Sequence, residues 1–187
     1  MKIALEVVTP KGRALATEVD EVNAPSADGE FGVLPGHVPM LASVRPGIVS
    51  WRDGSEWKRC AVGAGFIEVS GSAPEGGGDR VLLLSGEFTL REGVDPVIVR
   101  TELKDVQANI ATAEIEASDR GKESGRVAAA RLDELIEREN WLAAELELYG
   151  DPPPATMRPY EQFGPSSIDE SAGGSGEDEA AGPAAAP

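Results

Sequence analysis

The chain has 187 residues, of which 41% are hydrophobic, and its formal net charge at pH 7 is −16. The length and the apolar content suffice for one ordinary globular domain with a smaller one beside it. The negative charge argues against general nucleic-acid binding, which needs clustered Lys and Arg to displace counterions from phosphates. It also argues against attachment to an anionic lipid surface by charge alone.

The sequence also bears on where such a chain would reside. Its single cysteine, Cys60, cannot form an internal disulfide, which is typical of a reducing compartment. The first residues, MKIALEVVTPKG, do not resemble a signal peptide, because Glu6 interrupts the apolar run. No stretch approaches the roughly 18–20 apolar residues that a membrane span needs. We therefore expect a soluble protein without direct lipid insertion.

The first half of the chain, to about Phe88, has the pattern of β-structure. The segment KIALEVVT alternates, with Ile3, Leu5 and Val7 on one side. The segments GFIEVS and RVLLLS are two further short strands, separated by the Gly-rich stretch GSAPEGGGD. Several short strands joined by frequent turns favour a β-sandwich or a barrel.

A hairpin signal lies between the segments GIVSW and EWKRCAV. The dipeptide Asp53-Gly54 separates them, and we expect it to form a turn in which both residues adopt positive φ. Trp51 and Trp57 flank this turn. We expect these two tryptophans to pair across the strands.

The period changes after Asp95. Asp95 followed by Pro96 predicts a helix start, with a side-chain cap and a residue whose missing N–H costs nothing in the first turn. Apolar residues at spacings of 3 and 4 then form one stripe: Leu103, Val106, Ile110, Ala113 and Ala117. The pattern breaks in the polar run SDRGKESG, residues 118–125.

A second apolar stripe follows this break. Its members are Ala128, Leu132, Leu135, Leu142, Leu146 and Tyr149, with Glu139 at the skipped position and Trp141 off the stripe. Two amphipathic helices with a short polar connection predict an antiparallel hairpin. Its core would be small, so that it could open.

Order is expected to end after Tyr149. The segment GDPPPATMRP breaks any helix. The last residues, SSIDESAGGSGEDEAAGPAAAP, are acidic and poor in large apolar groups, which predicts disorder. The expected organisation is therefore a β-sandwich domain over residues 1–93, a helical hairpin over 94–149 and a disordered acidic tail over 150–187.

The sequence shows no enzyme site. His37 is the only histidine and has no partner for a catalytic triad, and one Cys with one His cannot form a zinc cluster. No G-x-x-x-x-G-K-[ST] motif is present, and GAGFIE lacks the last glycine of G-x-G-x-x-G. We therefore expect no catalytic residue, no cofactor and no metal.

The most distinctive stretch is DGEFGVLPGHVPMLASVRPG, residues 28–47, which is rich in turn formers such as Pro35-Gly36. Between the turn formers stand Glu30, Phe31, Val33, Leu34, His37 and Val38. A rigid corner that displays one acid, one imidazole and apolar groups suits a protein contact. The alternative is that Phe31, Val33 and Leu34 are core residues at a strand end.

In this stretch the sequence resembles the epsilon subunit of the F-type ATP synthase, the counterpart of the mitochondrial delta subunit. The likeness extends to VVTPKG, to GAGFIEVS and to the order of a sandwich followed by a helical hairpin. It covers about residues 1–149. The tail from Gly150 and the Gly-rich insertion from Gly71 to Asp79 depart from the common form.

The resemblance implies a ten-stranded β-sandwich followed by two helices, without a catalytic residue. It implies a rotor subunit of the central stalk, peripheral on the cytoplasmic face of the bacterial inner membrane, that couples proton translocation to ATP synthesis. Its partners would be the gamma subunit and the c-subunit ring. By match, Glu30 and His37 would contact the c ring, with Val33, Leu34 and Val38 as neighbours. The alternative function is a free-standing adaptor or chaperone with a β-domain and a coiled-coil arm.

In many bacterial members of this family the hairpin extends transiently into the catalytic alpha/beta head and restrains ATP hydrolysis. Basic residues on the second helix would favour contact with the acidic surfaces of the head. From residue 126 to 149 this helix carries Arg126, Arg131 and Arg138 against Asp133, Glu134, Glu137, Glu139, Glu145 and Glu147. Like charges oppose docking, so we expect a hairpin that stays folded and inhibits weakly.

Some family members bind ATP on the hairpin through a motif of an aliphatic residue, Asp, two variable residues, Arg and Ala. The matching run here is VDPVIV, from Val94 to Val99. Asp95 is present, but Ile98 and Val99 replace the Arg and the Ala. Without the Arg a triphosphate loses a charge-assisted fork, so we expect no ATP binding.

Overall fold

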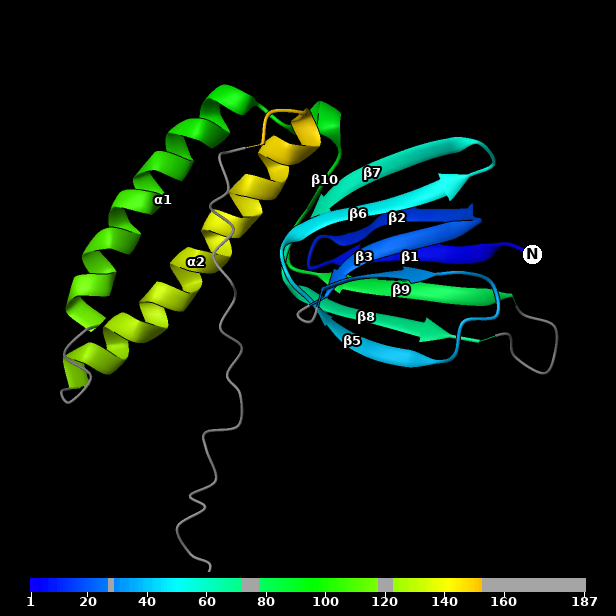
Figure 1. The fold of residues 1–187 in the computed structure, drawn as a ribbon, viewed down its shortest axis with the longest axis horizontal. Coiled ribbons are helices and arrows are strands. Elements are labelled where there is room, and N and C mark those ends of the chain that lie inside the picture. Colours follow the sequence, from blue (N-terminus) through cyan, green and yellow to red (C-terminus); the bar gives the residue numbers. More distant parts are fainter. Residues whose placement is uncertain (27–28, 72–77, 118–122, 153–187) are drawn as a thin grey trace, which may run out of the picture.

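The computed structural model describes residues 1–26, 29–71, 78–117 and 123–152. It contains ten strands followed by two long helices, and Figure 1 shows the helices side by side at one end of the β-structure. The expected fold, a ten-stranded β-sandwich followed by an antiparallel helical hairpin, is confirmed. All but the first three residues of the expected tail, most of the Gly-rich insertion and the connection between the helices lie outside the described residues.

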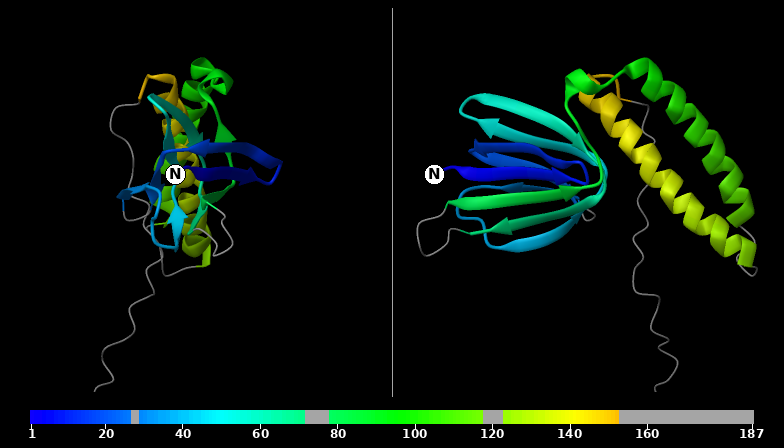
Figure 2. Two further views of the ribbon diagram at one scale, coloured as in Figure 1. Left: turned by 90° about the vertical axis from the view of Figure 1, so that its right-hand side faces the viewer. Right: turned by 180° about the vertical axis from the view of Figure 1, so that it is seen from behind.

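The strands form one sheet that folds over on itself into two layers (Figure 2). Their bounds are β1 (Ile3–Thr9), β2 (Gly12–Val19), β3 (Glu21–Ser26), β4 (Gly29–Val33), β5 (Met40–Val44), β6 (Gly47–Asp53), β7 (Glu56–Val62), β8 (Gly65–Ser70), β9 (Asp79–Ser85) and β10 (Phe88–Thr89). The order is β10-β7-β6-β3-β5-β8-β9-β1-β2, and β4 pairs with β3. The pair β1–β9 is parallel and the other pairs are antiparallel.

The core between the two layers follows from strand alternation. Ile3, Leu5 and Val7 are at most 1% exposed, as the pattern of β1 predicts, because alternate side chains of a strand point to opposite faces. Val49 of β6 and Leu83 of β9 belong to the same buried cluster, which joins the two layers.

The predicted β6–β7 hairpin is present, but its turn lies one residue later than expected. Asp53 and Glu56 are still paired as strand residues, so Gly54 and Ser55 form the two-residue loop. Gly54 has a φ of 63°, and no residue other than glycine has positive φ in the described part of the chain. One glycine at the first loop position is the pattern of a type II′ turn, which needs only a single positive φ.

The expected pairing of Trp51 with Trp57 is wrong. Trp51 lies opposite Lys58, and Trp57 lies opposite Arg52. The two tryptophans miss each other by one position, and neighbouring residues of a strand point to opposite faces of the sheet. Trp51 is therefore 3% exposed in the core, whereas Trp57 is 50% exposed.

A short 3₁₀ helix, Arg91–Gly93, leads to helix α1 (Pro96–Ala117). The predicted cap is confirmed, because Asp95 Oδ1 accepts hydrogen bonds from the N–H groups of Val97 at 3.0 Å and Ile98 at 3.3 Å. The predicted stripe is also confirmed, since its members are all buried: Leu103, Val106, Ile110, Ala113 and Ala117.

Helix α2 (Glu123–Tyr149) packs against two partners, α1 on one side and strands β6 and β7 on the other (Figures 1 and 2). Trp141, off the predicted stripe, is 5% exposed because this helix has a second apolar face toward the sandwich. Glu139, at the skipped position of the stripe, is 1% exposed and accepts a hydrogen bond from Gln107 Nε2 at 3.0 Å. Tyr149, the last member of the stripe, is 39% exposed.

The hairpin shares its apolar core with the sandwich. Ala61 of β7 and Ile48 of β6 belong to the same apolar cluster as Leu142 and Leu146 of α2 and Ile110 of α1. The core between the helices is therefore extended by one end of the β-structure. The division of the chain into separately folding domains at residues 93 and 149 stays a prediction.

Candidate contact surfaces

We define the turn loop as residues 34–39, which connect β4 with β5. Its first four residues form a β-turn, in which the N–H of His37 donates to the carbonyl oxygen of Leu34 at 3.0 Å. Pro35 stands at the second position and Gly36, with a φ of 87°, at the third. These are the residues that a type II turn requires at those positions. The expected turn at Pro35-Gly36 is therefore present.

The turn loop displays apolar side chains and an imidazole. Leu34 is 52% exposed and Val38 is 71% exposed. His37 is half-buried, and its Nδ1 donates a hydrogen bond to the carbonyl oxygen of Val38 at 2.8 Å. That hydrogen bond fixes the ring plane against its own loop.

Val33 is not a surface residue, although we expected it among the neighbours of a contact site. It is fully buried in the sandwich core, and half-buried Phe31 packs against the same core. The core alternative is therefore correct for these two residues, whereas Leu34 is exposed. The reason is strand alternation in β4, which points residues 31 and 33 inward.

We expected Glu30 and His37 to form one corner. They do not, because they lie at opposite ends of the sandwich. Glu30 is exposed near the β3–β4 turn, where Ser26 pairs with Gly29 and with Val44. Glu147 of α2 lines the same cavity as Glu30, so this is the end that carries the helices (Figure 1). The extended chain of β4 spans roughly 13 Å between Glu30 and the start of the turn loop at Leu34.

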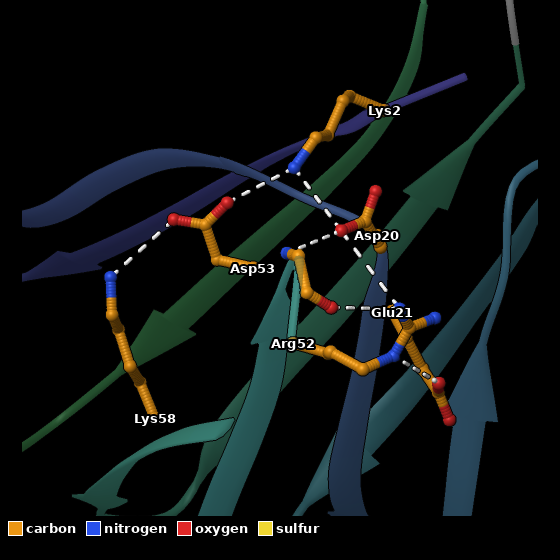
Figure 3. Close-up of polar contacts among 7 residues, drawn as sticks. Lys2, Asp20, Glu21, Arg52, Asp53 and Lys58 are labelled. Atoms are coloured by element: carbon orange, nitrogen blue, oxygen red, sulfur yellow. Dashed lines mark hydrogen bonds and ion pairs between the residues drawn. The ribbon is translucent and has the colours of Figure 1, made fainter. Parts of the chain in front are cut away.

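The turn loop lies at the other end, beside the N-terminus. The N–H of Gly36 donates to Asp79, and Asp79 pairs with Ile3 at the start of β1. The same end carries a group of ion pairs shown in Figure 3, in which Lys2 contacts Asp20 at 3.2 Å and Asp53 at 3.0 Å.

Glu30 lies among charged side chains. Glu30 lines a shallow cavity of about 300 Å³ together with Arg45, Arg59 and Glu147. Arg59 Nη2 is 3.0 Å from Glu147 Oε1, which links β7 to α2. Glu30 therefore lies in a mixed-charge surface, which carries both acidic and basic side chains.

An exposed apolar strip that sequence reasoning missed lies on the outer face of β5, β8 and β9. Leu41, Phe66 and Leu84 are 71%, 56% and 47% exposed. Phe66 pairs with Leu84, and Glu68 stands opposite Leu41. We call Leu41, Phe66 and Leu84 the outer strip. A signal was present in the sequence, because RVLLLS is apolar at successive positions, which is typical of a strand covered on both faces.

Metal binding and thiol chemistry can be judged from the described residues. No group of three or more His, Cys, Asp or Glu side chains among them could hold a metal ion. Cys60 is fully buried, and burial raises the pKa of its thiol to about 12. A thiol with so high a pKa is not a nucleophile at neutral pH.

Comparison with known proteins agrees with a contact role. A family model described as "ATP synthase, Delta/Epsilon chain, beta-sandwich domain" matches residues 2–73. The ATP synthase epsilon chain of Anaeromyxobacter dehalogenans is 33% identical over 134 residues, which cover 71% of this chain and 96% of that protein. The chain belongs to the ATP synthase epsilon-chain family.

Other relatives extend this comparison. ATP synthase epsilon chain 2 of Syntrophotalea carbinolica is 38% identical over 109 residues, covering 58% of this chain and 74% of that protein. A chain in the structure of the Euglena gracilis mitochondrial ATP synthase, described as OSCP/F1/c-ring in rotational state 1, has the same fold with a TM-score of 0.56. It is 21% identical, and the match covers 78% of this chain and 81% of that one.

Neither helix of this epsilon-family chain, as far as the chain is described, is long and apolar enough to cross a lipid bilayer.

Proposed function

We propose that this chain is a non-catalytic rotor subunit of the F-type ATP synthase and helps to couple proton translocation to ATP synthesis from the central stalk. The observation that carries the proposal is the alignment with an epsilon chain over 96% of that protein and 71% of this chain. Exposed apolar and charged surfaces, without a metal cluster in the described residues, suit a protein that works by contact.

The outer strip and the turn loop form the contact surface for the gamma subunit in this proposal. Both are apolar and exposed, and the chain runs directly from Val38 in the loop to Leu41 in the strip. A lasting interface between stalk subunits buries apolar side chains in its centre. Large exposed apolar residues that follow one another on a surface mark such an interface.

Glu30 remains our candidate for contact with the c ring. It is exposed, and it lies in a mixed-charge surface near Arg45 rather than beside the apolar side chains of the turn loop. Polar and charged groups form the rim of interfaces and determine register more than affinity. We therefore assign His37, Leu34 and Val38 to the gamma contact instead, because they lie at the other end of the sandwich.

The helical hairpin restrains hydrolysis only weakly in this proposal. Its three arginines are the residues that would contact the acidic surfaces of the head. Arg138, however, is already ion-paired with Glu87 of the sandwich at 2.8 Å and with Glu102 of α1 at 2.6 Å. Docking into the head would break the ion pair with Glu87, which holds the hairpin on the sandwich. ATPase activity of the head complex, measured with the full chain and with a version that ends at Gly93, should differ by less than about twofold. A several-fold higher activity with the shortened version would contradict weak restraint.

The test of function is reconstitution. An ATP synthase that lacks its epsilon subunit should regain ATP synthesis and retain this chain in the purified complex when the chain is added. The double variant Phe66→Ser/Leu84→Ser should lose binding to the gamma subunit by about tenfold or more, since each buried apolar side chain contributes roughly 1.5–3 kcal/mol. Val97→Ser is the matched control, because Val97 is 73% exposed on α1, away from the outer strip.

The contrary outcome is equally clear. A folded chain that neither binds gamma subunit nor restores synthesis would favour the free-standing adaptor or chaperone.

Glu30→Gln tests the c-ring contact separately. It should lower ATP-driven proton pumping without changing gamma binding, and unchanged pumping would remove Glu30 from that role.

A further inference from the structure

We infer that Asp79 is the positioning residue of the turn loop and holds it in the shape that displays Leu34 and His37. This rests on the proposed gamma contact for its functional meaning. The observation itself is a hydrogen bond between distant parts of the chain, in which the N–H of Gly36 donates to Asp79 Oδ2. The two residues are 43 positions apart.

Asp79 is placed by the sheet and not by the loop. It is the first residue of β9 and pairs with Ile3 in the parallel β1–β9 ladder. Asp79 is only 5% exposed. A buried carboxylate is costly unless it accepts hydrogen bonds, so this position favours a donor such as the Gly36 N–H.

The turn depends on the backbone freedom of its glycine. Gly36 has a φ of 87°, a region that side chains with a Cβ rarely adopt. A Cβ built on Gly36 would meet no atom within 4 Å, so glycine is required for the backbone angle rather than for space. The internal bond from His37 to Leu34 closes the turn, and the bond to Asp79 ties the closed turn to the sheet.

A second turn at the same end offers a matched control. Asp20 Oδ2 accepts a hydrogen bond from the N–H of Gly54, in the β6–β7 turn, at 2.7 Å (Figure 3). Both sites therefore pair an aspartate, Asp79 at the start of β9 or Asp20 between β2 and β3, with the backbone N–H of a turn glycine at positive φ. Removal of each aspartate should release its own turn alone.

The experiment measures amide hydrogen exchange by NMR in the full chain and gamma-subunit binding by calorimetry. Asp79→Ala should speed exchange at Gly36 by about tenfold, the loss of one hydrogen bond to a charged group, and leave Gly54 unchanged. Asp20→Ala should speed exchange at Gly54 and leave Gly36 unchanged. Gamma binding should weaken severalfold in Asp79→Ala and stay at the level of the natural chain in Asp20→Ala.

Asp79→Asn keeps an acceptor oxygen and nearly the same shape, so it is the second variant in case Asp79→Ala does not fold. It should give an exchange rate at Gly36 and a gamma affinity between those of the natural chain and Asp79→Ala. Unchanged Gly36 exchange in every folded Asp79 variant would overturn the inference. Faster exchange with unchanged gamma binding would support the role of Asp79 in holding the turn and overturn the turn loop as the gamma contact.

Discussion

Arg138 Nη1 on helix α2 lies 2.8 Å from Glu87 Oε1 in the connection between β9 and β10, so that one ion pair ties the hairpin to the sandwich. The same guanidinium donates from Nε and Nη2 to Glu102 of α1 at 2.8 Å and 2.6 Å. Three parts of the chain thus meet at one side chain. A substitution of Glu87 therefore tests the contact between hairpin and sandwich, and a substitution of Glu102 tests the contact within the hairpin.

We expect Glu87→Gln to loosen the docked hairpin. Partly exposed pairs of this kind contribute up to about 1 kcal/mol, so the population of undocked hairpin should rise by up to about fivefold. Inhibition of ATP hydrolysis by the head complex should become stronger accordingly. Glu102→Gln is the control, because its pair with Arg138 persists within the hairpin whether or not the hairpin is docked. Equal inhibition by both variants would contradict the assignment of Glu87 as the tie.

A pH dependence of stability follows from Glu145, which lies near the same cluster. The pKa of this carboxyl is raised to about 7, mainly by burial; Arg138 lowers it, and Glu87 and Glu102 add to the rise. The folded protein therefore holds this proton more tightly than the unfolded chain. The stabilising contribution is fully present below the ordinary pKa of 4.5 and is lost as the pH rises through 7.

Urea unfolding of the natural chain and of Glu145→Gln checks this dependence. Glutamine cannot ionise, so the variant should gain in free energy of unfolding relative to the natural chain as the pH rises from 5 to 8. Burial also raises the pKa of Glu137, in the same direction, and Glu137 remains in both proteins. A difference between the two proteins that stays constant over this range would contradict the raised pKa of Glu145.

We expect no ATP binding by the isolated chain at physiological concentrations. Ile98, at the position of the motif arginine, is 63% exposed and has no charge, and Val99 is buried in the hairpin core. Arg100 is a poor substitute, because it lies two positions on and is ion-paired with Asp151. Isothermal titration calorimetry is the measurement. A micromolar dissociation constant would show that another cation replaces the missing arginine.

The C-terminal tail should contribute little to stability, with the exception of its first residues. The N–H groups of Gly150 and Asp151 both donate to Leu146 at the end of α2, and Asp151 also pairs with Arg100. A chain that ends after Pro152 should melt within about 1 °C of the full chain. One that ends after Gly150 should melt about 2–4 °C lower, for a loss of roughly 1 kcal/mol.

Thermal unfolding followed by circular dichroism distinguishes the two ends. Equal melting temperatures for both shortened chains would contradict the role of Asp151 in closing α2. A fall of several degrees for the chain that ends after Pro152 would show that residues 153–187 stabilise the body.

The sequence by itself determined the elements. Alternation in KIALEVVT placed Ile3, Leu5 and Val7 inside, Asp95-Pro96 marked the start of α1, and the spacing of apolar residues selected the buried stripe of that helix. These features depend on residues a few positions apart, and the backbone geometry of a strand or helix sets which of them share a face. The resemblance in residues 28–47 supplied the family for the same reason, since it is carried by one contiguous run of residues.

Only the tertiary structure decided how the candidate site is arranged. It separated Glu30 from His37 by the length of β4, buried Val33, and brought Asp79 to Gly36. It also buried Trp141, because α2 packs against the sandwich as well as against α1. Each of these outcomes depends on which strands and helices meet across long stretches of chain. Local periodicity fixes the face on which a side chain stands, but the pairing of distant elements fixes what that face meets.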